Sequence, residues 1–117
     1  YVNGSQVTSK THNNSTVNQN SAFSIGRRHD TDAAYYDGKI DEVAYWDMEL
    51  SASAITALYN SGTPLSASSD SGNYTSSDNL VAYYQFQENL NDSEGSFTLS
   101  NHDNNIGSSN YVAETIE

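Results

Sequence analysis

The chain has 117 residues, enough for one small domain, and its 15 carboxylates against four Lys and Arg give a formal net charge of −11 at pH 7. A field of this sign repels nucleic acid and anionic membranes and favours divalent cations or a cationic partner, with a solvated acidic surface as the plainer explanation. The absence of Cys excludes thiolate metal sites and disulfides, and no apolar run approaches the roughly 20 residues of a membrane span.

The N-terminal part of the chain carries a hairpin signal, a loop and a strand. An Asn-Gly pair at positions 3–4, after an apolar pair, favours a type I′ turn, because both central residues of that turn need a positive φ. Residues 8–21 are rich in Asn, Ser and Thr without a period, which predicts a loop. Residues 22–28 alternate, so a strand there would turn Phe23 and Ile25 inward.

Next come the strongest strand signal and the one convincing helix. Residues 38–46 predict the strand, and a shift in its apolar spacing predicts either a bulge or two covered faces. Residues 50–62 predict the helix, which Ser51 can cap at its N-terminus and Gly62 can close at its C-terminus. One face of that helix carries the apolar residues Ile55, Leu58 and Tyr59.

The second half of the chain begins with a Ser/Asn/Asp/Gly stretch and continues with strands. Residues 65–78 have the composition of a linker, with Tyr74 as the single core candidate. Apolar runs then predict strands at 80–87, 97–99 and, at an edge, 111–113. Strands joined by polar turns, with one short helix, predict an all-β sandwich.

The stretch from Gly38 to Gly62 resembles the closing segment of laminin-G-like domains, which have the concanavalin-A-like lectin/glucanase fold. The likeness rests on the strand core Ile40-Asp41-Glu42-Val43, on the helix ending Leu58-Tyr59-Asn60, and on two earlier pieces in the family's order, Tyr1–Gly4 and Phe23–Gly26. It covers about residues 1–62 and implies an antiparallel β-sandwich, a jelly roll, as found in bacterial and phage surface proteins. Because lectins, adhesins, phage structural proteins and glycosidases share this fold, the resemblance does not decide the function.

The resemblance also implies a division of the chain. Domains of this family are typically longer than this chain, so residues 1–64 are expected to be the C-terminal half of a sandwich, joined by the linker 65–78 to a strand block at 79–117. That block resembles the opening of another such domain, and it either folds back on the sandwich, completes a neighbour's, or opens a second repeat. We favour fold-back or donation between subunits, because open sheet edges template aggregation. Since the sequence begins at Tyr1 rather than Met, we expect a mature product or a fragment.

A loop rich in aromatic and polar residues is the candidate ligand site. Sugar rings pack on flat aromatic surfaces while paired polar groups fix their orientation. This chemistry favours binding of a carbohydrate at Tyr35, Tyr36, Arg28 and His29. The alternative is that one of the two tyrosines enters the following strand and packs there.

Acidic residues raise two further hypotheses. Oxygen ligands for Ca²⁺, the one cofactor expected, are available in the same loop from Asp30, Asp32 and Asp37, although ordinary acidic turns are the plainer explanation. The Asp41-Glu42 pair suggests a glycosidase, but neighbouring strand residues point to opposite faces and cannot act on one substrate without a bulge. We therefore expect no enzymatic activity and a structural role for this pair, and we expect Trp46 to seal the core under the helix.

Two functions follow from these features. The first is recognition, by a carbohydrate-binding adhesin module on a cell surface or phage tail, with a glycan or surface receptor as its partner. The second is structural, by a fibre, filament or capsid-decoration subunit that assembles with its own copies through strand complementation. An accessory module of a glycoside hydrolase is the remote alternative. We expect the chain to be extracellular or on a virion, without nucleic-acid binding or membrane insertion.

Overall fold

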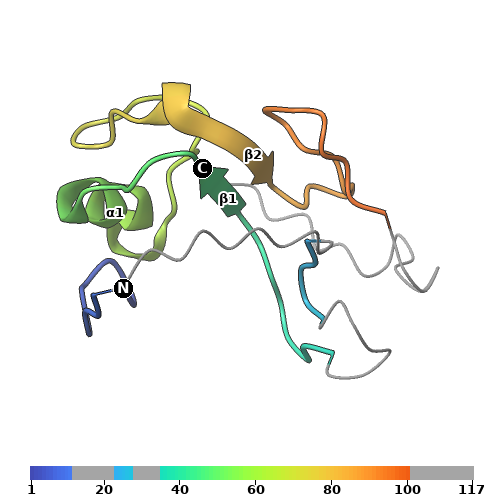
Figure 1. The fold of residues 1–117 in the computed structure, drawn as a ribbon, viewed down its shortest axis with the longest axis horizontal. Helices are drawn as coiled ribbons and strands as arrows, with labels where there is room; N and C mark the ends of the chain where they lie inside the picture. The colour runs from blue at the N-terminus through green and yellow to red at the C-terminus, as the bar shows by residue number, and fades with distance from the viewer. Residues whose placement is uncertain (12–22, 28–34, 101–117) are drawn as a thin grey trace. The chain divides into compact units, whose positions relative to one another are not determined.

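The computed structural model describes residues 1–11, 23–27 and 35–100. The chain divides into two compact units, which we name the strand unit (Tyr1–Thr8 and Asp41–Glu117) and the loop unit (Ser9–Ile40). Every helix and strand of the described residues belongs to the strand unit (Figure 1). Their order along the chain is β1 (Val43–Trp46), α1 (Ala52–Tyr59), the 3₁₀ turns η1 (Asn60–Gly62) and η2 (Ser77–Asn79), and β2 (Leu80–Tyr84).

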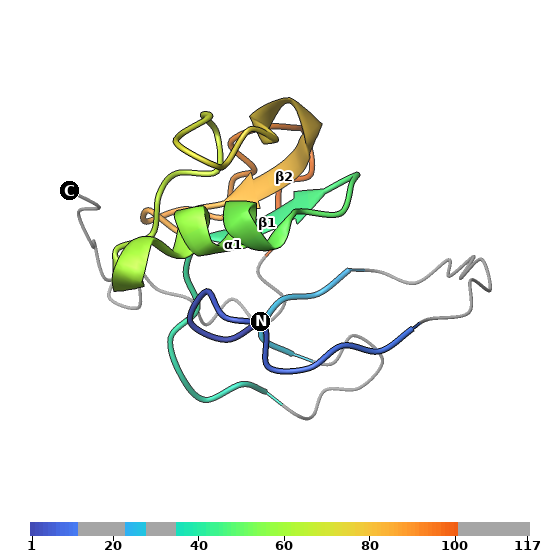
Figure 2. The ribbon, with the colours of Figure 1, turned by 90° about the vertical axis from the view of Figure 1, so that its left-hand side faces the viewer.

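β1 and β2 form a two-stranded antiparallel sheet, in which Ala44 lies opposite Tyr83. The register shifts between Tyr45 and Trp46, which pair with Ala82 and Leu80, so β2 carries one extra residue there. A two-stranded sheet is marginally stable by itself, so both strands depend on the segments packed around them. Figure 2 looks at the strand unit from the side of α1, which crosses in front of the two strands. The second sheet of the predicted sandwich is not among the described residues.

Both strands are shorter than the sequence predicts. The strand predicted at 38–46 begins only at Val43, because Glu42 has a φ of 52°, in the left-handed region where an extended strand cannot continue. The strand predicted at 80–87 likewise ends with β2, and Phe86 has a φ of 50°. A backbone reversal of this kind leaves no trace in the apolar spacing, which alone set the predicted boundaries.

Other predicted strands are wrong or fall outside the described residues. Arg27 makes only an isolated bridge in the strand predicted at 22–28, and Phe23, expected to point inward, is 63% exposed. An apolar alternation forms a strand only where a packed face receives it, and the side chain of Phe23 meets none. Residues 97–99 contribute a single backbone bond rather than a strand, and 111–113 lie outside the described residues.

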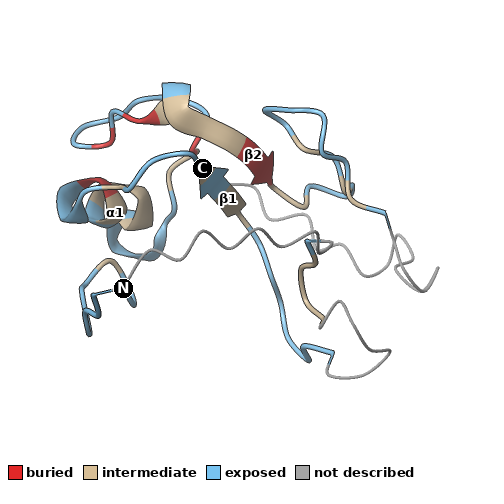
Figure 3. Ribbon diagram, viewed as in Figure 1, coloured by how far each residue is buried: buried red, intermediate tan, exposed pale blue. Residues whose placement is uncertain are grey.

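β2 is buried on both of its faces (Figure 3). Tyr83 is 1% exposed, and its strand neighbours Ala82 and Tyr84 are also buried, which covers both faces because successive side chains alternate. On one face Tyr84 stacks on Phe86, with ring centroids 6.3 Å apart, and donates its hydroxyl to the Phe97 carbonyl at 2.8 Å. The chain after β2 therefore folds back over this strand.

The segment with the composition of a linker, 65–78, packs into the core. Tyr74 is 0% exposed, and its hydroxyl accepts a hydrogen bond from Trp46 Nε1 at 2.9 Å and donates one to the Ala67 carbonyl at 2.7 Å. Ala67 and Ser76 are buried as well. Trp46 is thus held by this segment, while the division of the chain into three parts stays a prediction.

α1 begins at the cap that the sequence predicts. Ser51 is extended, and its hydroxyl accepts the N–H of Ala54 at 3.1 Å. The helix ends at Asn60 rather than near Gly62, because Asn60 takes the left-handed conformation that Asn tolerates and donates its N–H to the Thr56 carbonyl. The predicted apolar face is half-buried, at Ile55, Leu58 and Tyr59. Within the described residues no helix has the length and apolar character to cross a membrane.

The predicted N-terminal hairpin is confirmed, and it packs on α1. Val2 and Ser5 exchange backbone hydrogen bonds of 2.9 and 3.0 Å, and the φ angles of Asn3 and Gly4 are 49° and 73°. Two positive φ values in succession define a type I′ turn. Thr56 in α1 donates its hydroxyl to the Gly4 carbonyl at 2.8 Å, which ties the turn to the helix.

Candidate functional site

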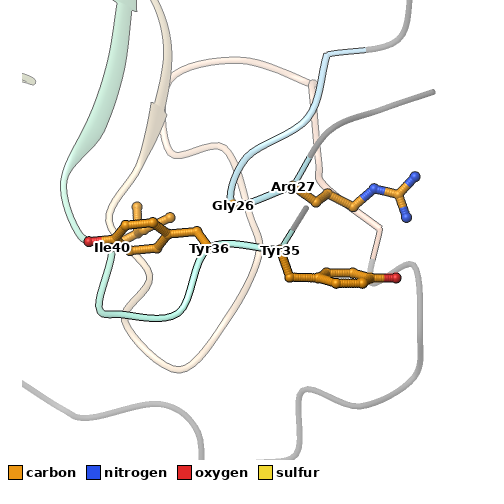
Figure 4. A pocket seen from close by; sticks show the side chains of 5 residues that line it. All are labelled: Gly26, Arg27, Tyr35, Tyr36 and Ile40. Carbon is orange, nitrogen blue, oxygen red and sulfur yellow. The ribbon is translucent and has the colours of Figure 1, made fainter. Parts of the chain in front are cut away.

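The loop unit forms a shallow hollow of about 440 Å³ between two short stretches of chain (Figure 4). Its lining residues, which we name the tyrosine hollow, are Gly26, Arg27, Tyr35, Tyr36 and Ile40. An isolated antiparallel bridge joins Arg27 to Tyr35, and the Tyr36 N–H donates to the Gly26 carbonyl at 2.8 Å. Backbone bonds therefore hold the two stretches together at this hollow.

Both tyrosine rings of the hollow are open to solvent, Tyr35 being 52% and Tyr36 60% exposed. A Cβ on Gly38 would lie 2.7 Å from the Tyr36 ring, so the ring occupies space that only a glycine leaves free. In Figure 4 the Tyr36 ring extends toward Ile40, whereas Tyr35 and Arg27 extend together in the other direction. Exposed aromatic faces beside a guanidinium suit a ligand with apolar C–H faces and hydroxyls.

The predicted ligand residues are only partly brought together. Tyr35 and Tyr36 line the hollow, and the alternative that one of them packs in a strand is wrong, since both are exposed and neither lies in β1. Arg28 and His29 lie outside the described residues. The sequence reasoning missed Arg27, because its place opposite Tyr35 depends on a bridge that no local pattern predicts.

The predicted Ca²⁺ site stays a prediction. Asp30 and Asp32 lie outside the described residues, and Asp37 is exposed. Across residues 1–11, 23–27 and 35–100, no group of three or more His, Asp or Glu side chains is placed to hold a metal ion. Asp37 is thus the one predicted ligand that falls within the described residues.

A second cluster, in the strand unit, centres on Glu42. The Tyr83 hydroxyl donates to Glu42 Oε2, whereas Glu42 Oε1 is buried without a hydrogen-bond partner. Asp41 Oδ1 accepts the Glu42 N–H at 3.0 Å, a contact with a backbone donor of the kind expected for a structural pair. Burial, and then the neighbouring Asp41 charge, raise the pKa of Glu42 to about 7.

The two outer edges of the sheet differ. The Tyr83 N–H donates to Asp92 Oδ1 at 2.8 Å, and the Tyr83 carbonyl accepts from the Ser93 N–H at 2.9 Å, so the loop after β2 covers the outer edge of that strand. Because both backbone groups of Tyr83 bond outside the sheet, its partner Ala44 forms a non-hydrogen-bonded pair and directs its own N–H and C=O away from β2. Within residues 1–11, 23–27 and 35–100, no residue bonds to them.

Residues 1–56 match the family model described as the concanavalin A-like lectin/glucanases superfamily, a laminin-G type. No curated protein and no solved structure matches the chain. The matched residues include the tyrosine hollow and β1, and they confirm the resemblance seen in the sequence. A β-sandwich of a carbohydrate-binding type is what this superfamily implies. Residues 1–56, just under half of the chain, are therefore similar to the concanavalin A-like lectin/glucanases superfamily.

Proposed function

We propose that this chain is a non-enzymatic binding module that takes a carbohydrate in the tyrosine hollow. The observation that carries the proposal is the pair of half-exposed rings, Tyr35 and Tyr36, beside Arg27 in a segment of lectin/glucanase type. A sugar presents an apolar C–H face that stacks on such a ring, while its hydroxyls accept and donate hydrogen bonds at the rim. If the two rings served packing alone, we would expect them to be buried.

A glycan array screened with the full chain, with and without Ca²⁺, tests this proposal. Tyr36→Ala should weaken binding about tenfold, the loss expected when about 1.4 kcal/mol of stacking is removed. Tyr45→Ala is the matched control, because Tyr45 lies in β1 outside the hollow and is also 60% exposed. Equal effects of the two substitutions, or no binding by the parent chain, would contradict the proposal.

A specific observation favours a second candidate, assembly by strand complementation. The outer edge of β1 presents the N–H and C=O of Ala44, while Asp92 and Ser93 cover the outer edge of β2. An open edge accepts a strand from a neighbouring molecule through backbone bonds. A fibre or capsid-decoration subunit would use this edge, and the antiparallel sandwich would then be completed between copies.

Light scattering after size exclusion tests assembly. Ala44→Pro removes an N–H that points away from β2, so it should block added strands while leaving the β1–β2 bonds in place. Ala52→Pro is the matched control, because the first helical position tolerates proline. We expect the parent chain and the Ala52→Pro control to assemble, and Ala44→Pro to remain monomeric. A parent chain that is monomeric at every concentration would rule this candidate out.

Both candidates place the module outside the cell or on a virion. The composition supports that location, since a Cys-free, acidic, Tyr-rich surface suits bacterial and phage surface proteins. Fractionation of the producing cells or particles tests it, and recovery of the protein from the cytosol alone would contradict it.

A further inference from the structure

One side-chain contact joins β2 to the residue that precedes β1. Tyr83 lies opposite Ala44, and Glu42 directly precedes β1, two residues before Ala44. The Tyr83 hydroxyl reaches Glu42 Oε2. The contact therefore spans the two strands and holds together segments that are far apart in the sequence.

The surroundings of the Glu42 carboxyl oppose its ionisation. Tyr83 is almost fully buried, and Glu42 Oε1 is buried without a donor, so a carboxylate would keep one oxygen unsatisfied. The groups that act on Glu42 are Asp41, an anion on its own segment, and Tyr83, which faces it from β2. No Lys or Arg of the described strand unit counters the charge, since that unit contains neither residue type.

The backbone holds the carboxyl in this place. Glu42 has a φ of 52°, which non-glycine residues adopt rarely and which persists where surrounding contacts impose it. Its N–H is bonded to Asp41 Oδ1. The carboxyl is thus presented to Tyr83 by a locally constrained turn rather than by a free surface side chain.

We propose that Glu42 and Tyr83 form a proton-dependent clasp between β2 and the residue before β1, which stabilises the sheet while the Glu42 carboxyl is protonated and destabilises it when the carboxyl ionises. The protonated carboxyl accepts a hydrogen bond from the Tyr83 hydroxyl and carries no charge. Ionisation strengthens that single bond, but it also leaves Oε1 without a donor and sets a second negative charge beside Asp41. The clasp depends on neither of the functions proposed above.

The direction of the pH dependence follows from the environment of Glu42. Burial and Asp41 raise the pKa of Glu42 from 4.5 to about 7. A carboxyl whose pKa is raised by folding stabilises the folded chain fully below about pH 4.5, and this stabilisation is lost as the pH rises through about 7. An ion-paired carboxylate would behave in the opposite way. Mild acid therefore stabilises the pairing of β2 with β1, and mild alkali weakens it.

Urea unfolding of the full chain at about pH 5 and about pH 8, followed by the fluorescence of Trp46, tests the clasp. The midpoint should fall on the order of 0.5 M between the two pH values, a modest shift because Glu42 is only partly shielded from water. Glu42→Gln should lose this pH dependence, because Gln keeps the shape and the acceptor but cannot ionise. Glu49→Gln, which removes an exposed carboxylate after β1, is the matched control and should keep it.

Two further readouts separate the clasp from simple packing. The three histidines titrate in the same pH range, so the quantity that matters is the difference between the parent chain and Glu42→Gln. Equal pH dependence in both would overturn the proposal.

A carbon-13 titration of the Glu42 carboxyl should give a midpoint near 7, and a midpoint near 4.5 would also overturn it. Tyr83→Phe should lower the urea midpoint more at about pH 8 than at about pH 5, because the hydroxyl bonds more strongly to an ionised carboxyl, whereas equal losses would show packing alone.

Discussion

Replacing Tyr74 by Phe removes one oxygen from the centre of the strand unit and leaves the ring in place. That oxygen accepts the Trp46 Nε1–H at 2.9 Å and donates to the Ala67 carbonyl at 2.7 Å. The rings of Tyr74 and Trp46 meet edge to face, 6.3 Å apart at 80°, and this contact survives the substitution. Burial raises the pKa of Tyr74, so the hydroxyl stays protonated and available as a donor across the working pH range.

The expected cost comes from the two groups that lose their partner. Tyr74 and Ala67 are buried, so water does not replace the bond to the carbonyl, and the half-buried Trp46 N–H loses its acceptor. An unsatisfied buried group costs about 1–3 kcal/mol, and we expect a loss of about 2 kcal/mol in the free energy of unfolding. With a urea m-value of about 1–3 kcal/mol per molar, the midpoint should fall by about 1 M.

The assay is urea unfolding monitored by fluorescence, which reports on this contact because Trp46 is the single Trp of the chain. Tyr45→Phe is the matched control, since Tyr45 is largely exposed and its hydroxyl should contribute little. A Tyr74→Phe chain with the midpoint of the parent would refute the reasoning, because the segment 65–78 would then not be anchored through this hydroxyl.

Three other substitutions have expected outcomes. Ser51→Ala removes the N-cap of α1 and should cost about 1 kcal/mol of unfolding free energy in the same urea assay, where an unchanged midpoint would contradict the cap. Asp92→Ala removes the acceptor of the Tyr83 N–H and should cost about 1–3 kcal/mol, with faster amide exchange at Tyr83; unaltered exchange would show that the loop does not cover β2. Gly38→Ala should displace the Tyr36 ring, which a Cβ there would approach to 2.7 Å, and should weaken glycan binding with little effect on stability. Full binding by Gly38→Ala would mean that the position of this ring is not needed.

Local chemistry made parts of the fold predictable. The Asn-Gly pair at positions 3–4 requires positive φ angles, and the type I′ turn is present. Ser51 precedes a helical pattern with a side chain that can accept a backbone N–H, and it caps α1. In both places the residues within one turn of the chain decide the structure, so the sequence pattern is sufficient.

Other features depend on contacts between distant segments, and the sequence predicted them only in part: Tyr74 was the one core candidate of residues 65–78, but its partners were not predicted. The composition of residues 65–78 is that of a linker, yet Tyr74 is buried there because Trp46 and Ala67 supply its hydrogen-bond partners. The strand predicted at 38–46 was too long because the left-handed Glu42 interrupts it. The predictions rested on the spacing of apolar residues along the chain. That spacing does not reveal the distant hydrogen-bond partner of a hydroxyl or a single residue with a positive φ.

The residues of the candidate site were likewise predicted only in part. Tyr35 and Tyr36 were predicted together because adjacent aromatic residues in a polar loop are visible in the sequence. Arg27 was missed in favour of Arg28, because one residue of register decides which side chain faces a bridged partner. Arg27 and Tyr35 lie eight positions apart along the sequence, and no local pattern encodes a pairing over that distance.

Carbohydrate binding in the tyrosine hollow can be observed by an NMR titration of the labelled full chain with the glycans of the array, taken as a pooled mixture and then singly. We expect shifts in the backbone signals of Gly26, Tyr36 and Gly38, and in the ring signals of Tyr35 and Tyr36, while those of β1 and α1 stay in place. Shifts confined to the strand unit, or none with any glycan, would contradict carbohydrate binding in the tyrosine hollow.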